Sequence, residues 1–71
     1  MNDHVYKLIE LIGTSTVSVD NAIKHAVQRA DARLKNLRWF EVAEIRGHLD
    51  QNKAVHWQVK LKVAFNVESE E

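Results

Sequence analysis

Two side chains with complementary recognition chemistry, Trp39 and Gln58, lie in the two extended stretches of the C-terminal half of the chain. An indole presents a flat face that stacks on other rings, and such stacking contributes about 0.5–1.5 kcal/mol beyond the area it buries. A carboxamide both donates and accepts hydrogen bonds, so it can pair with the polar edge of a heterocycle. The pair therefore predicts a site for a flat, hydrogen-bonding ring. The alternative is that Trp39 anchors a subunit interface, as tryptophan often does, and that Gln58 is a solvated strand residue.

A second candidate group is Arg46, Gly47 and His48. The planar guanidinium of arginine binds phosphate through two parallel hydrogen bonds, and His48 could add another. A glycine inside a strand predicts a bulge or a close approach of another backbone. The alternative is a charged strand end beside a twist in the sheet.

The sequence contains no recognisable motif for a catalytic site or a metal site. No nucleophile-elbow motif frames a serine, and two glycines do not make a phosphate loop. There is no cysteine, and the four histidines lack the close spacing of metal ligands. We expect neither an enzyme nor a metal site. His25, Arg29 and Arg33 share one outer side of the predicted helix, either as a solvated surface or as a contact for a second anion.

The N-terminal half must position these residues through one strand and one helix. Val5–Ile12 is rich in aliphatic side chains on both faces and predicts a strand, and 13–16 carries turn residues. Ser18 is a good N-cap for a helix over 18–36. The apolar face of this helix, at three- and four-residue spacing, consists of Val19, Ala22, Ile23, Ala26, Val27, Ala30 and Leu34. Its three alanines would let the helix lie close to a sheet.

The C-terminal half predicts two long strands, 37–49 and 55–67, joined by a polar hairpin loop over 50–53. In the first strand Trp39 alternates with residues that include Arg46, and neither face is cleanly apolar. In the second strand every odd position from Val55 to Val67 is apolar, so these residues form the core face. Gln58 must then point to the opposite face.

The predicted fold is a single α+β domain over 1–71, with one helix packed on a three-stranded antiparallel sheet of β-α-β-β order. The acidic tail 68–71 is expected to be disordered. One helix cannot cover both faces, so the exposed apolar face predicts an interface. A core of this size rarely supplies more than about 3–5 kcal/mol, and without disulfides or metals self-association is the remaining means of stabilisation.

Composition narrows the possible partners. Ten basic residues balance ten acidic ones, which argues against a nucleic-acid-binding surface. No apolar run approaches the roughly 18 residues of a membrane span. The first residues lack the features of a secretory signal. We therefore expect a cytoplasmic protein with no nucleic-acid or membrane partner.

Three stretches of the chain together resemble the dodecins, small flavin-binding proteins, in their bacterial branch. The stretches are Val5–Lys7 running into Glu10–Ser15, Trp39–Val42 with Ile45–His48, and Gln58–Val59 with Lys62–Phe65. The resemblance covers nearly the whole chain. Two residues depart from the family pattern: Ala64 stands where a glycine is expected, and Leu8 where a lysine is common.

The resemblance implies a dodecin-like sheet wrapped around one helix, a hollow homododecamer and flavin pockets between subunits. It implies that Trp39 stacks on the flavin, that Gln58 binds the isoalloxazine edge, and that Arg46 lies near an FMN phosphate. His48, which follows Arg46 closely in the sequence, is a further candidate for the same pocket. The expected function is storage and sequestration of FMN or riboflavin, with quenching of the bound flavin by the tryptophan. Coenzyme A is a further implied ligand, to which we assign no residues.

Two other functions remain open from the sequence. One is a structural or interaction module in which Trp39 anchors a subunit interface and no flavin binds. The other is a flavin-dependent enzyme, for which paired stacking around the flavin leaves little room for a substrate.

Overall fold

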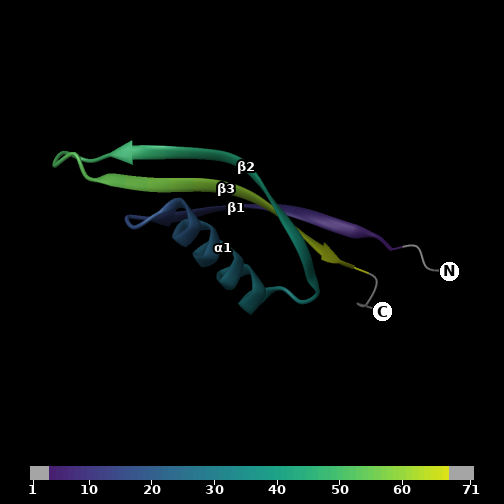
Figure 1. The fold of residues 1–71 in the computed structure, drawn as a ribbon. Helices are drawn as coiled ribbons and strands as arrows, with labels where there is room; N and C mark the ends of the chain where they lie inside the picture. Colours follow the sequence, from purple (N-terminus) through teal and green to yellow (C-terminus); the bar gives the residue numbers. More distant parts are fainter. Residues whose placement is uncertain (1–3, 68–71) are drawn as a thin grey trace.

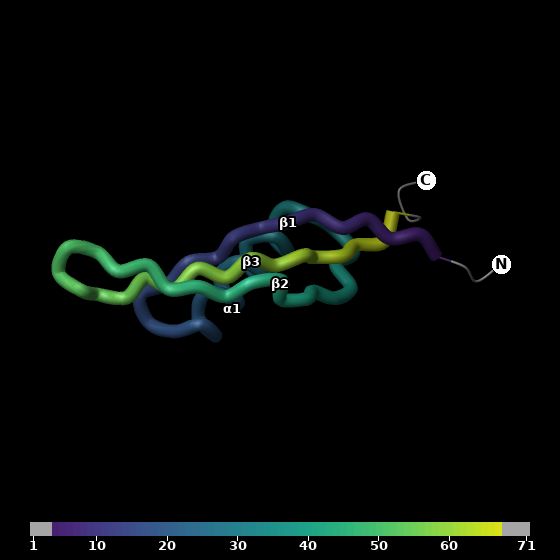
Figure 2. The backbone as a smooth tube through the Cα atoms, turned by 90° about the horizontal axis from the view of Figure 1, so that it is seen from above, coloured from purple at the N-terminus to yellow at the C-terminus, as the bar shows by residue number. Residues whose placement is uncertain are grey.

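The chain folds as one helix packed against one face of a three-stranded antiparallel sheet (Figure 1). The computed structural model describes residues 4–67, so the expected disorder of 68–71 lies outside the described residues. The elements are β1 (Tyr6–Ser15), α1 (Val19–Arg33), β2 (Leu37–Leu49) and β3 (Val55–Asn66). Their spatial order is β1-β3-β2, with β3 in the centre, as the view from above in Figure 2 also shows. The predicted α+β class and β-α-β-β order are confirmed.

The helix begins where the sequence predicts and ends earlier. Ser18 is the N-cap, and its Oγ accepts a hydrogen bond from the backbone N–H of Asn21 at 3.0 Å. At the other end, Leu34 is already extended and Asn36 adopts a left-handed φ of 64°. Asparagine tolerates that conformation better than most residues, so the chain can turn sharply into β2. The prediction of a helix up to residue 36 was three residues too long.

Gly13 lies inside β1, although we predicted that the strand would stop before it. The strand continues to Ser15, whose Oγ accepts hydrogen bonds from the backbone N–H groups of Val17 and Ser18. A Cβ at Gly13 would stand 2.9 Å from the Cβ of Ala26, closer than such atoms pack, and would also clash with the carbonyl oxygen of Ala22. Glycine at this position therefore lets the helix lie directly on the strand.

The core forms between α1 and the central strand. Val59, Leu61 and Val63 of β3 are buried, and the alanines that meet the sheet are buried as well. These alanines are Ala22, Ala26 and Ala30. Both the predicted core face of β3 and the alanine face of the helix are confirmed in this central region.

The second strand receives almost no cover from the helix. Every residue of β2 from Arg38 to Leu49 is exposed. Phe40 points to the same face as the helix, and its exposed fraction is still 45%. A groove of about 610 Å³ separates Phe40 from α1.

Among residues 4–67 the structure contains no helix with the length and apolar character of a membrane span.

Candidate functional site

Two register shifts in β2 decide which of its side chains share a face with Gln58. Residues directly opposite each other in antiparallel strands point to the same side of the sheet. Gln58 pairs with Arg46, while Ala64, which lies on the same face as Gln58, pairs with Trp39. One shift falls between Leu37 and Trp39. The other falls between Val42 and Glu44.

The shift at Ala43 corrects our prediction for β2. Strict alternation would place Trp39 and Arg46 on opposite faces. Because the extra residue Ala43 reverses the alternation, both side chains lie on the face away from the helix, which we call the outer face. The bulge does not lie at Gly47, where we predicted a bulge or a close approach. A Cβ at Gly47 would make only ordinary contacts, 3.5 Å from Val55 and 3.6 Å from Trp57.

One end of the outer face carries an exposed aromatic group. Trp39 is 46% exposed, and its ring meets that of Tyr6 edge-on with the centroids 4.9 Å apart. Between their strands lies Ala64, which is fully buried and is flanked in the sheet by Leu8 and Trp39. We call Tyr6, Leu8 and Trp39 the aromatic end. It offers an indole that is held by a neighbouring ring and still open to a partner.

The other end carries hydrogen-bonding and charged groups. Gln58 and Arg46 are direct cross-strand partners, and the next pair along the sheet is Lys60 with Glu44. One carboxylate oxygen of Glu44 lies 3.5 Å from the guanidinium of Arg46 and 3.7 Å from the Nζ of Lys60. We call these four residues the polar quartet. It combines an amide that reads hydrogen-bonding edges with two cations able to hold an anion.

The aromatic end and the polar quartet are far apart within one chain. Ala64 and Gln58, which mark the two positions on β3, are six residues apart. At a rise of about 3.3 Å per residue this separation is about 20 Å, far longer than three fused six-membered rings. The structure thus brings Gln58 and Arg46 together and keeps Trp39 away from them. A ring that touches both Trp39 and Gln58 needs a second copy of the chain.

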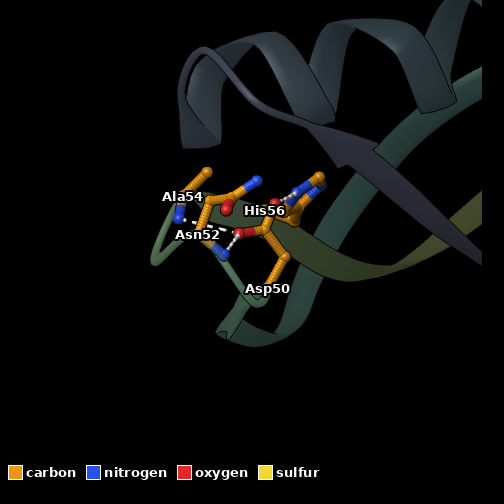
Figure 3. Close-up of polar contacts among 4 residues, drawn as sticks. All are labelled: Asp50, Asn52, Ala54 and His56. Carbon is orange, nitrogen blue, oxygen red and sulfur yellow. Dashed lines mark hydrogen bonds and ion pairs between the residues drawn. The ribbon is translucent and has the colours of Figure 1, made fainter.

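His48 lies beyond the polar quartet, near the tip of the β2–β3 hairpin. It pairs with His56, with ring centroids 6.2 Å apart. His56 Nε2 lies 3.0 Å from Oδ2 of Asp50, whose other oxygen accepts hydrogen bonds from the backbone N–H groups of Asn52 and Ala54 (Figure 3). These hydrogen bonds, that of His56 first, hold the pKa of Asp50 below its usual value.

The three residues predicted to share one outer side of the helix do not line the same groove. His25 and Arg29 line a groove of about 620 Å³ between α1 and β1, and the ring of His25 lies 3.4 Å from the carbonyl oxygen of Thr14. Arg33 is an exposed residue of the last helical turn and does not line this groove.

Glu44 and Tyr6 are two further residues of the candidate site, and neither was among the residues predicted from the sequence. Glu44 contacts Arg46 and Lys60, and Tyr6 contacts Trp39. The spacing of Glu44 and Arg46, two positions apart in one strand, was the available signal. No local pattern pairs Tyr6 with Trp39, because the two strands are separated by the helix in the chain and by β3 in space.

Comparisons with known proteins agree on one family. A dodecin family model matches residues 5–68. The chain is 45% identical over 64 residues to a dodecin of Thermus thermophilus, covering 90% of this chain and 93% of that protein. It is 36% identical over 63 residues to a calcium dodecin of Mycobacterium tuberculosis, covering 89% of each. The solved structure of a Streptomyces davaonensis dodecin is 43% identical, with a TM-score of 0.87 over 94% of this chain and 98% of that one.

Proposed function

We propose that this chain, which belongs to the dodecin family, stores and sequesters FMN or riboflavin and quenches the bound flavin. It is a dodecin-type small-molecule-binding protein, and the recognition groups on its outer face support flavin as the ligand. The observation that carries the proposal is the division of this face into an exposed indole at one end and the Gln58–Arg46 pair at the other. Stacking and edge recognition are what an isoalloxazine ring requires.

The proposed pocket is built from two copies of the chain. Because about 20 Å separates Trp39 from Gln58 within one chain, the aromatic end of one copy would face the polar quartet of another. Family membership implies self-association, and the exposed apolar residues of the outer face support it. We further propose that the assembly is a homododecamer with the flavins between its subunits.

Each pocket residue has one role in this proposal. Trp39 stacks on the ring, and its electron-rich indole quenches the photoexcited flavin. Gln58 pairs with the polar edge of the ring, and Arg46 holds the phosphate when the ligand is FMN. His48, one pair further along the same face, contacts the polar side chain of the flavin.

The remaining parts of the proposal rest on the sequence and on the family rather than on the geometry of the outer face. We propose a cytoplasmic binding protein without enzymatic activity, for which coenzyme A is a further ligand. The Mycobacterium tuberculosis relative is named for calcium, so a calcium titration belongs in the same set of binding measurements.

The test compares flavin binding by the wild type and by Trp39→Ala. We expect the wild type to quench the emission of FMN and riboflavin on titration, and Trp39→Ala to lose both tight binding and quenching while the assembly mass is unchanged. Trp57→Phe is the matched control, because Trp57 lies on the helix side, beside Gly47. If neither the wild type nor Trp39→Ala quenched flavin emission, the flavin assignment would be refuted and a module in which Trp39 only anchors subunits would be favoured. Equal binding and quenching by the two proteins would refute the role of Trp39.

A further inference from the structure

Glu44 is the one acidic member of the polar quartet, and it contacts both of the cations there. Its Oε1 lies 3.5 Å from Arg46 and 3.7 Å from Lys60. The bulge at Ala43 turns the Glu44 side chain to the outer face, next to the Arg46–Gln58 pair. A carboxylate beside both cations partly neutralises the positive charge that a phosphate would use.

We propose that Glu44 sets the selectivity of the pocket between flavins, by holding Arg46 and Lys60 and so lowering the advantage of a phosphorylated flavin over riboflavin. This inference rests on the proposed flavin function and concerns the same site. It assigns Glu44 as a specificity-determining residue that acts through Arg46. FMN must displace the carboxylate from the guanidinium, whereas riboflavin carries no phosphate and has no need to do so.

Two physical effects act in the same direction. First, Arg46 cannot present its full planar fork to a phosphate while Glu44 occupies part of it. Second, the phosphate of FMN carries about −1.5 to −2 charges at neutral pH, and a carboxylate at ion-pair distance from the same guanidinium repels it. The side chains are partly exposed, Arg46 at 53% and Lys60 at 35%, so water and salt screen the repulsion. A preference change of about three- to tenfold is the expected size.

The experiment measures the dissociation constants of FMN and riboflavin by quenching of flavin emission, for the wild type and Glu44→Gln. We expect the ratio of the FMN constant to the riboflavin constant to fall about three- to tenfold in Glu44→Gln. The fall should shrink as the salt concentration rises, because screening weakens the interaction between charges. Replacing Arg46 by Gln in the Glu44→Gln background should return the ratio toward the wild-type value. The phosphate of FMN has then lost the guanidinium that Glu44 contacts in the wild type.

Glu41→Gln is the matched control. Glu41 lies on the same strand and the same face, opposite Lys62 and outside the polar quartet. If the ratio changes no more in Glu44→Gln than in Glu41→Gln, or if Glu44→Gln weakens both flavins equally, Glu44 does not set the selectivity and the inference is wrong. If the wild type binds neither flavin, the proposed function is wrong, and the inference about Glu44 is wrong as well. The two failures are thus told apart by the wild type alone.

Discussion

A methyl group added at Gly13 is the sharpest test of how the helix is seated on the sheet. The new Cβ of Gly13→Ala would stand 2.9 Å from the Cβ of Ala26 and 3.1 Å from the carbonyl carbon of Ala22, and nearer still to the carbonyl oxygen of Ala22. Carbon atoms pack best at about 3.5–4.0 Å, so the helix must move away by roughly 0.5–1 Å. That movement loosens Ala22 and Ala26 against Val59 and Leu61, which form the core cluster.

The cost of this overpacking should lie at the upper end of its usual range, about 2–3 kcal/mol. For a domain of this size each kcal/mol lowers the melting temperature by about 4–8 °C, so Gly13→Ala should melt about 8–24 °C below the wild type. Thermal unfolding followed by circular dichroism measures the difference. The protomer concentration must be held constant, because self-association adds to the apparent stability.

Gly47→Ala is the matched control, since Gly47 is the other glycine of the chain and also lies in a strand. A Cβ there meets Val55 and Trp57 at ordinary distances. Alanine also has less conformational entropy to lose than glycine, so we expect a gain of about 0.5–1 kcal/mol. The reasoning would be refuted if Gly13→Ala melted within a degree or two of the wild type, or if both substitutions were equally damaging.

Two further predictions concern the hairpin tip and the polar quartet. The pKa of Asp50 is held low by hydrogen bonds from His56 and from the amide of Ala54. The ionised carboxylate therefore stabilises the fold fully at pH values above the usual pKa of an aspartate, and this stabilisation is lost as the pH falls through the lowered pKa. Asp50→Asn should therefore flatten the acid side of the melting-temperature profile, and superimposable profiles would contradict this. Gln58→Ala should weaken flavin binding by about 1–3 kcal/mol, measured by quenching, because it leaves the edge of the ring unpaired. Gln51→Ala in the exposed turn is its control and should bind as the wild type does.

The elements of this fold could be predicted from local patterns. Ser18 as the N-cap, the alanine face of the helix and the odd-numbered core face of β3 all follow from hydrogen-bonding chemistry and from periodicities of 3.6 and 2 residues. The boundaries at Gly13 and Leu34 were missed. Gly13 reads as a turn residue in the sequence, and only the packing of α1 reveals that it is a contact point inside a strand.

The candidate site depended on more than local pattern. The sequence by itself determined which recognition groups are present, an indole, a carboxamide and a guanidinium, and that Gln58 faces away from the core. The tertiary structure decided that Trp39 joins Gln58 and Arg46 on one face, because the bulge at Ala43 reverses the alternation of β2. A bulge is selected by the pairing of two strands, so no periodicity within one strand reveals it. The same pairing fixes the separation of Trp39 from Gln58 along β3, and with it the need for a second chain to complete the proposed pocket.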